Sequence, residues 1–491
     1  MTGRRVLMVA LDGLDIGVLR RAFAAGRLPN LRAWAVANTE LEVRSDGERL
    51  EGTVWPTFTT GTGPGTHGHH WFYQWIADEA RFVPASHPHF SVEPFWKEAL
   101  EAGRRVIEFD MPYTLTVGHP NERAYNGWGL QDEMAEFAYP ASFRKQILQR
   151  HGHSKVQKDT LLVRTPEDRL RLARRLRSAT RQRSAVLLDL AERRDWDLLI
   201  FGFGELHLGG HHLSLPMDLS PKVTNEAAMY SILRPLDDAW PALVRAVGDD
   251  CDIVLFALHG MRPKVSYGEA VIGMLRTMAG QPLPEPPRDD LLRRARNLVP
   301  QRLHQAIWLR LPADLRMRRM MNAWLARMDI HNDKAFVFEG DCAVAIRLNI
   351  EGRERYGVLP REQSRAHLET IAQEAKRYTA EDGQKAFVDL FVTADAFHGP
   401  RQDFLPDGCL IYNPDVVRAR TLTRDDGFQI QLHGAESRNG AHTGTGFAFY
   451  QESGTSRLHR SQVDNLDFAP TVLQRIGVTP GTALEGTPFV E

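Results

Sequence analysis

The sequence predicts an α/β fold, a three-layer αβα sandwich in which helices cover both faces of a largely parallel central sheet. Short apolar runs bounded by Gly, Pro or Asp alternate with longer amphipathic segments along the whole chain, as expected for strands joined by crossover helices. A composition of 43% hydrophobic and 25% charged residues is that of an ordinary globular protein. No stretch of about eighteen apolar residues occurs, so we expect no membrane-spanning helix.

The first predicted strand covers residues 6–11, an apolar run that is too short for a signal peptide. The other predicted strands are residues 105–109, 198–202, 253–258, 343–350, 387–393 and 446–450. Helical periodicity predicts long helices over residues 166–192 and 227–247. Since strands near both ends of the chain have the same character, we expect one sheet to include both ends.

The length of 491 residues fits one large domain or two to three ordinary ones, so the pattern must decide between them. Because the strand and helix rhythm runs from end to end, we predict a single catalytic domain over residues 1–491. Residues 281–329 depart from it, being first Pro-rich and then strongly basic. We interpret them as a helical insertion or cap, whose charge marks either a solvated helical face or a surface for a partner or substrate.

The charge balance and the cysteines limit the partners and the compartment. Lys and Arg total 61 against 62 Asp and Glu, and this net charge of -1 indicates no nucleic-acid partner. Three cysteines without CxxC spacing indicate neither a disulfide framework nor a thiolate zinc site. We therefore expect a reducing, cytoplasmic compartment.

Two segments near the N-terminus carry candidate catalytic groups. Asp12 follows the first predicted strand, where open α/β sheets place ligands, although Asp-Gly is also a common turn. The segment of residues 51–70 contains five threonines between positions 53 and 62. A hydroxyl at the start of a helix is well placed to meet a phosphate, and a capped turn is the alternative reading.

Histidines supply the candidate metal ligands. His207 and His211 lie four residues apart after a predicted strand, so on a helix both imidazoles face the same way and can bind one metal ion. His259 follows another predicted strand, and His442 precedes the last one. Each of the latter two is unremarkable alone, but together the four histidines form a candidate set.

In this order the segments resemble the type I phosphodiesterase and nucleotide pyrophosphatase branch of the alkaline-phosphatase superfamily, in particular its bacterial phosphohydrolase-like members. The resemblance runs from end to end. It rests on VLMVALDGLD, WPTFTTGTGPGTHG for the family's TG-x-x-P-x-x-HG, HLGGH for DxxGH, LHGM for DHGM, RNGAH for RxGxH and the closing DFAPTVLQRIGV. The segment KAFVFEGDCAVAIRLNIEGRERYGVL also looks like a stretch common in those bacterial members.

The resemblance implies an alkaline-phosphatase-like fold and a phosphoric ester hydrolase with a Thr nucleophile between two divalent cations, usually zinc, with manganese as another candidate. It assigns Asp12 and His259 to one metal and His207, His211 and His442 to the other. It implies a small-molecule phosphate ester, a diester or a phosphorylated glycan or lipid head group, as the substrate. A sulfatase, a phosphomutase and a catalytically degenerate metal-binding protein remain the alternative functions.

Three departures from the family pattern concern the site. His207 stands where the family has an aspartate, and Leu258 stands where DHGM has a metal-binding aspartate. Counting ten residues back from Gly61, where the family has its nucleophile, gives Glu51. We therefore keep Thr53 open as the nucleophile in a shorter loop, with Thr57, further into the predicted helix, as a more remote choice. Glu51 as an additional metal ligand is the other reading.

The segment around residue 350 offers candidate contacts to an anionic substrate. Arg353 and Asn349 are the candidates, because the guanidinium fork matches phosphate oxygens. An ion pair at the end of a strand is the alternative reading for Arg353.

Overall fold

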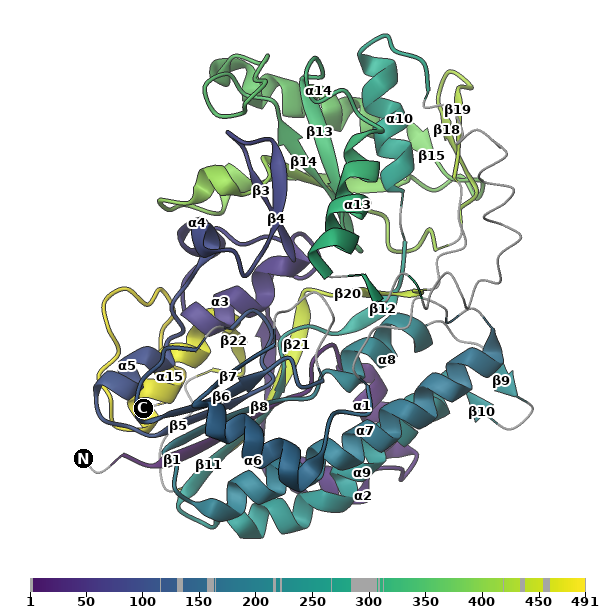
Figure 1. Ribbon diagram of the computed structural model, residues 1–491. Coiled ribbons are helices and arrows are strands. Elements are labelled where there is room, and N and C mark those ends of the chain that lie inside the picture. The colour runs from purple at the N-terminus through teal and green to yellow at the C-terminus, as the bar shows by residue number, and fades with distance from the viewer. Residues whose placement is uncertain are drawn as a thin grey trace.

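The computed structural model describes residues 3–114, 116–129, 136–156, 163, 165–214, 218–220, 223–265, 267–283, 307, 310, 311, 313–417, 419–432, 438–453 and 460–490. Figure 1 shows two parts, a helix-covered sheet that contains both ends of the chain and a smaller part above it. In the described residues no helix is long and apolar enough to cross a bilayer.

The larger part is built on a nine-stranded sheet with the order β22-β2-β21-β11-β1-β8-β5-β6-β7. Only β21 and β7 run against the other strands, so the sheet is largely parallel as predicted. Both ends of the chain contribute, as expected. The strands are β1 (Arg5–Ala10), β2 (Thr39–Arg44), β5 (Val106–Phe109), β6 (Glu122–Asn126), β7 (Phe137–Tyr139), β8 (Leu198–Gly202), β11 (Cys251–Ala257), β21 (Thr445–Gln451) and β22 (Gln462–Asp464).

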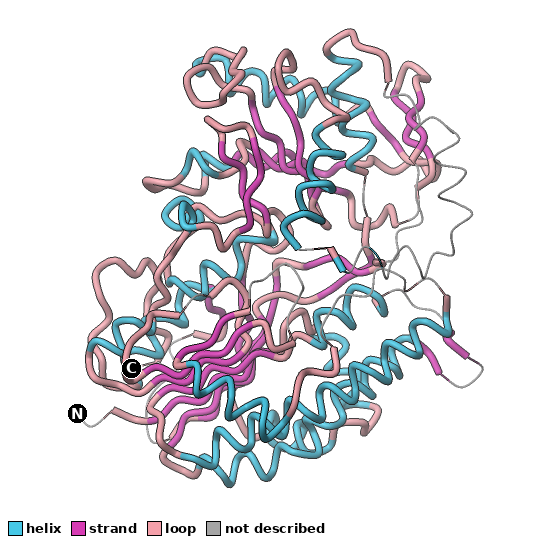
Figure 2. The backbone as a smooth tube through the Cα atoms, in the orientation of Figure 1, coloured by secondary structure: helices cyan, strands magenta, loops and turns pink. Residues whose placement is uncertain are grey.

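Helices pack on both faces of this sheet, because successive residues of a strand point their side chains to opposite faces. Leu7 and Val9 of β1 join one core, and Val6 and Met8 join the other. The first face is covered by α1 (Ile16–Ala24), α2 (Pro29–Val36), α6 (Ala141–His151), α7 (Pro166–Arg193), α8 (Glu205–Leu213) and α9 (Asn225–Val247), and the second by α3 (Val54–Thr60), α5 (Trp96–Glu101) and α15 (Phe468–Arg475). Figure 2 shows these layers, which confirm the three-layer prediction.

The smaller part, here called the cap, comprises the described residues between 267 and 432 together with a hairpin of β3 (Tyr73–Ile76) and β4 (Arg81–Pro84). It has its own hydrophobic core around the four-stranded sheet β13-β14-β17-β16. Its main elements are β13 (Ala335–Glu339), β14 (Ala343–Leu348), β16 (Phe387–Val392), β17 (Gly408–Tyr412), α10 (Gly268–Met278), α13 (Ala313–Leu325) and α14 (Ser364–Ala375), beside a three-stranded sheet of β15 (Tyr378–Thr379), β18 (Thr421–Arg424) and β19 (Gln429–Gln431).

Two strands predicted from the sequence, residues 343–350 and 387–393, therefore form β14 and β16 of the cap and not part of the central sheet. Apolar residues of both strands contribute to the cap core, so their apolar pattern does not say which sheet they join. Most of the predicted insertion, residues 284–306, 308, 309 and 312, lies outside the described residues. Its described helix α13 packs on the cap sheet, where Trp324 donates a hydrogen bond to the carbonyl of Val337.

Buried histidines follow the short helix α4 (Pro64–His67) and make stability depend on pH. Burial lowers the pKa of His69 to about 4 and that of His70 to about 3, against 6.5 in an exposed chain. Since the unfolded chain takes up the proton below pH 6.5 and the folded chain resists it down to those values, each histidine should reduce stability by about 2 kcal/mol at pH 5.

We therefore expect the metal-free protein to lose stability as the pH falls from 7.5 to 5.0, and His70→Leu to lose about 2 kcal/mol less over that interval. Urea unfolding of both proteins at the two pH values, with chelator present, measures the difference. Equal pH dependence in the two proteins would show that folding does not lower the pKa of His70.

Candidate functional site

The candidate site lies at the carboxyl ends of three adjacent strands of the central sheet. Asp12 follows β1, His259 follows β11, and α8 follows β8 and carries His207 and His211. Because β11, β1 and β8 are parallel neighbours, their carboxyl ends meet at one edge. This topology gathers residues that are more than two hundred positions apart.

His442 reaches the same place from a short antiparallel ribbon. It ends β20 (Gly440–His442), which pairs with β12 (Met261–Pro263). β12 begins two residues after His259, and Met261 lies opposite His442. The ring centroids of His259 and His442 are 4.4 Å apart, and those of His207 and His442 are 5.0 Å apart. The structure thus brings together all five residues that the sequence proposed as metal ligands.

Asp12 lies at the centre of the polar contacts in this cluster. One carboxylate oxygen is 3.1 Å from Nδ1 of His207, and the other is 3.2 Å from Nε2 of His259. Trp55 Nε1 donates a hydrogen bond of 3.0 Å to Asp12. Burial by itself would raise the pKa of Asp12, but His207 and His259 outweigh burial and hold the pKa well below its usual range. Asp12 is therefore a carboxylate at neutral pH.

His211 and His442 are buried and neutral. Burial is the main cause that lowers their pKa values well below the ordinary value, and the neighbouring histidines lower them further. His211 contacts the carbonyl of Gly440 through Nδ1 at 2.9 Å, and its Nε2 is 2.9 Å from Nε2 of His207. Two lone-pair nitrogens at that distance repel each other unless a proton or a cation lies between them.

His442 is the clearest sign of a cation site. Among the described residues neither of its ring nitrogens has a hydrogen-bond partner, although the side chain is only 5% exposed. A buried, unpaired imidazole is costly, and such groups are usually satisfied by a metal ion or water. Ligand atoms of His207, His259 and His442 lie within 4.8 Å of one another. The donor set, rich in imidazole with a carboxylate, suits a divalent cation.

A buried ion cluster holds α8 in place below the histidines. Arg183 of α7 donates to Glu205 at the start of α8 at 2.9 Å and to Asp110 after β5 at 2.7 Å. The side chain of Arg183 is fully buried. Asp110, which follows β5, therefore helps to hold α8 through Arg183.

Glu51 and Thr53 lie on the short 3-10 helix Glu51–Thr53 that leads into α3, but they face different ways. Glu51 lines the same cavity as Asp12 and the histidines. The hydroxyl of Thr53 is buried and donates a 2.7 Å hydrogen bond to the carbonyl of Leu50, and Thr53 is absent from the described residues that line the cavity. For Thr53 to reach a substrate, its hydroxyl would have to leave Leu50.

Sequence reasoning missed a third carboxylate, Asp341. It lies at the tip of the β13–β14 hairpin of the cap, where its backbone N–H donates to Glu51 at 3.0 Å. Burial and the charge of Asp341 raise the pKa of Glu51 to about 8. Burial would also raise the pKa of Asp341, but Lys264 and Arg438 hold it below its usual range. The only sequence signal was the acidic residue in the turn Glu-Gly-Asp-Cys between two apolar strands.

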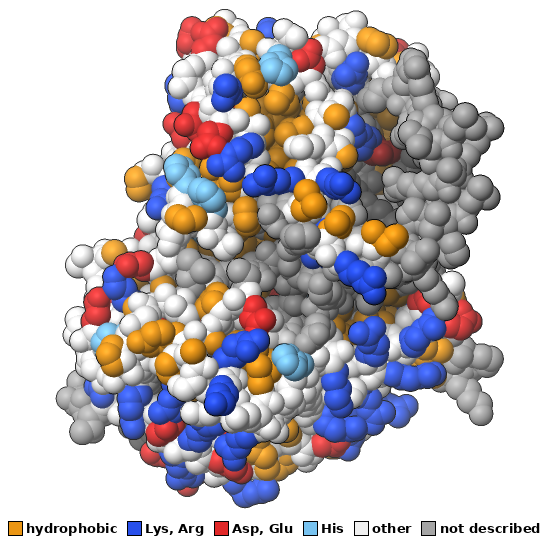
Figure 3. All heavy atoms as spheres, viewed as in Figure 1, with side chains coloured by type: hydrophobic (Ala, Val, Ile, Leu, Met, Phe, Trp, Pro, Cys, Tyr) orange, Lys and Arg blue, Asp and Glu red, His pale blue; other side chains and the backbone are white. Residues whose placement is uncertain are grey.

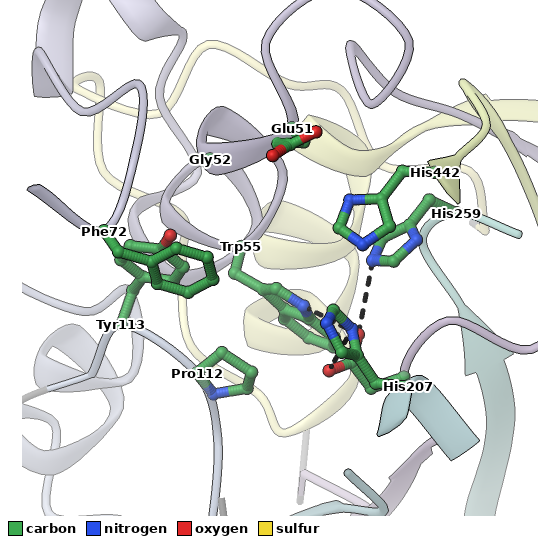
Figure 4. Close-up of a pocket in the computed structure, with 10 residues that line it drawn as sticks. Glu51, Gly52, Trp55, Phe72, Pro112, Tyr113, His207, His259 and His442 are labelled. Carbon is green, nitrogen blue, oxygen red and sulfur yellow. Dashed lines mark hydrogen bonds and ion pairs between the residues drawn. The ribbon is translucent and has the colours of Figure 1, made fainter. Parts of the chain in front are cut away.

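A partly open cavity lies beside the cluster. Its polar wall is formed by Asp12, Glu51 and the histidine cluster, and its opposite wall is apolar (Figure 4). Phe72 and Tyr113 stack there with ring centroids 5.3 Å apart, beside Trp55 and Pro112. Trp75, three residues after Phe72, packs in the cap core. The described lining contains no serine or threonine.

Arg353 and Asn349 lie in the cap and not in the described lining of this cavity. Arg353 forms ion pairs with Asp407 at 2.7 Å and Glu354 at 2.9 Å, and Asn349 donates to the carbonyls of Ile330 and Asp333. Both side chains thus tie loops to the cap sheet. The structure therefore supports the interpretation of Arg353 as a member of an ion pair.

The outer surface carries charges of both signs. Figure 3 shows acidic and basic side chains interspersed on the face in view, with basic ones gathered where α7 runs. The exposed arginines of α7 are Arg171, Arg174, Arg175, Arg177 and Arg181. The candidate site itself is buried between the sheet and the cap, where its own residues set the local charge.

Comparison with known proteins identifies the family of this chain. The family model described as type I phosphodiesterase / nucleotide pyrophosphatase matches residues 6–436. A search of curated proteins found no match.

Solved structures share the fold at low sequence identity. Phosphonoacetate hydrolase from Sinorhizobium meliloti 1021, in complex with phosphonoformate, is 13% identical with a TM-score of 0.55, covering 97% of each chain. Human ectonucleotide pyrophosphatase / phosphodiesterase 5 is 11% identical with a TM-score of 0.51, covering 99% of this chain and 97% of that one. At these identities the similarity establishes the alkaline-phosphatase-like fold.

Proposed function

The chain belongs to the type I phosphodiesterase / nucleotide pyrophosphatase family and is accordingly a phosphoric ester hydrolase, and from that premise we propose that its buried histidine cluster is a divalent-metal centre that hydrolyses a small phosphoric diester. The observation that carries the proposal is the convergence of Asp12, His207, His211, His259 and His442, with both nitrogens of buried His442 lacking a partner among the described residues. Imidazole-rich sets favour zinc, and manganese is the next candidate.

We assign different roles in the proposed site to the described residues. Asp12 and the four histidines would hold the metal, and a bound divalent cation supplies charge neutralisation at the phosphoryl oxygens and a water of lowered pKa. Trp55 keeps Asp12 oriented through its hydrogen bond. We propose Glu51 as a further ligand, because its carboxylate lines the cavity while the Thr53 hydroxyl is bonded to Leu50. The apolar wall excludes water and receives the ester group.

The chemistry of the cavity supports a small phosphoric ester as the substrate. The stacked rings of Phe72 and Tyr113 would contact an aromatic or apolar ester group, whereas the metal cluster would bind the phosphoryl group. A phosphorylated glycan or lipid head group presents the same phosphodiester, and only its second substituent differs.

A reducing, cytoplasmic compartment is supported by the cysteines. Cys251, Cys342 and Cys409 are buried and unpaired. Burial raises the pKa of the Cys251 thiol to about 12, so it stays protonated and unreactive.

Removal and return of metal tests the proposed function. We expect protein purified without chelator to contain bound divalent metal and to hydrolyse bis-p-nitrophenyl phosphate faster than p-nitrophenyl phosphate. A chelator should abolish turnover, and zinc or manganese should restore it. Elemental analysis and the release of p-nitrophenol measure both. Turnover that survives complete metal removal would contradict the metal-centre proposal, and bound metal without turnover of any ester would favour a metal-binding protein.

A further inference from the structure

Asp341 reaches the metal cluster from the cap and not from the central sheet. Strands β13 and β14 pair up to Glu339 and Val344, and the N–H of Gly340 donates to Ala343, so Asp341 and Cys342 form the tight end of the hairpin. Cys342 Sγ contacts the carbonyl of His442 at 2.7 Å, and the N–H of Asp341 donates to Glu51. These contacts hold the hairpin end against the site.

The Asp341 carboxylate then lies among donors of the cluster. One oxygen is 3.6 Å from Nδ1 of His211, and ligand atoms of His211, Asp341 and His442 lie within 4.8 Å of one another. His442 is the independent sign that a ligand belongs here, because neither of its buried nitrogens is paired among the described residues. The group of His211, Asp341 and His442 differs from that of His207, His259 and His442. The two groups overlap only at His442.

A carboxylate also fits the charge of the site. All four histidines are buried, and a dication held by neutral imidazoles needs nearby negative charge when water is excluded. Asp341 has a competing partner, since its other oxygen is 2.7 Å from Nζ of Lys264. An ion pair with Lys264 alone would explain a structural role, so the experiment must separate the two roles.

We propose that Asp341 is a metal ligand, supplied by the cap, that joins His211 and His442 in a second cation position beside that of Asp12 and His259. The inference rests on the proposed function, since it concerns the same metal centre. It adds that the cap closes the centre, so metal binding ties the cap hairpin to the catalytic sheet. Asp341 therefore couples occupancy of the site to docking of the two parts of the molecule.

The test compares metal binding in metal-free full-length wild type, Asp341→Asn, Lys264→Met and Asp395→Asn. Asp395 is an exposed cap carboxylate paired with Arg365, and its variant is the matched control. Zinc affinity is measured by competition with a chromogenic chelator and zinc content by mass spectrometry. Cobalt(II) absorption reports the ligands directly, and the metal-induced rise in Tm reports coupling to the cap.

We expect Asp341→Asn to weaken one zinc site at least about 100-fold, beyond the loss typical of an outer-sphere partner, and to change the cobalt spectrum. Lys264→Met should bind zinc as well as wild type or better, because it removes the nearer of the two cations beside the carboxylate and leaves only Arg438, at 4.0 Å, of that pair. Wild-type affinity and spectrum in Asp341→Asn would overturn the inference, and so would an equal loss in Lys264→Met. If Asp341→Asn fails to fold, Asp341→Glu gives the same spectroscopic comparison. Wild type that binds no metal at all would instead refute the proposed function.

Discussion

Replacing His442 with alanine should lower kcat/KM for bis-p-nitrophenyl phosphate by on the order of 10³-fold, which corresponds to about 4 kcal/mol of lost transition-state stabilisation. His442 has ligand atoms in both candidate metal groups, so its loss affects every cation position at once. The metal-free variant should stay folded, because the substitution removes two buried nitrogens that have no partner among the described residues. Steady-state kinetics and metal content measure the first effect, and thermal unfolding in chelator measures the second.

The control for His442→Ala is His331→Ala, which removes an exposed cap histidine. It should keep wild-type kinetics and metal content. Full activity in His442→Ala with its metal retained would show that the cluster is not the catalytic centre. Unfolding of the metal-free variant would show that His442 acts on stability first.

Glu51→Gln and Thr53→Ala should separate the two readings that the sequence left open. If Glu51 is a ligand, Glu51→Gln should lower both metal affinity and kcat/KM by about 100-fold or more, since an amide is a weaker ligand than a carboxylate. Thr53→Ala should lose only the hydrogen bond to Leu50, about 1 kcal/mol of stability, and keep activity within a few-fold. Both variants are compared by kinetics, metal titration and urea unfolding.

Trapping of a phosphoenzyme distinguishes the outcomes further. A covalent phosphothreonine that appears in wild type and disappears in Thr53→Ala, together with loss of turnover, would establish Thr53 as the nucleophile. That result would require the short helix Glu51–Thr53 to rearrange so that the hydroxyl leaves Leu50. Turnover without any trapped phosphoenzyme would agree with the static geometry.

Much of the catalytic part could be predicted from local pattern. The strands around residues 6–11, 198–202 and 253–258 read as apolar runs because they are buried on both faces of a parallel sheet. Asp12 and His259 could be assigned to one edge because parallel strands end together. The spacing of His207 and His211 required only that the segment be helical, and α8 is a helix.

The cap could not be separated from the central sheet in this way. Residues 343–350 and 387–393 have the apolar pattern of any buried strand, and nothing local states which sheet they join. Strand pairing depends on the whole chain, because a strand is stabilised by whatever edge it meets. The structural roles of Arg353 and Asn349 could not be predicted for the same reason, since their partners lie on other loops of the cap.

The sequence by itself determined the α/β architecture, the family and the five residues Asp12, His207, His211, His259 and His442, because each of these follows from periodicity or from a motif within a few residues. Only the tertiary structure decided that Glu51 and not Thr53 faces the cavity, and that Asp341 approaches the histidine cluster from the cap. The direction of a side chain at a helix start depends on one backbone turn, and the approach of Asp341 to His211 depends on the packing of two separate cores.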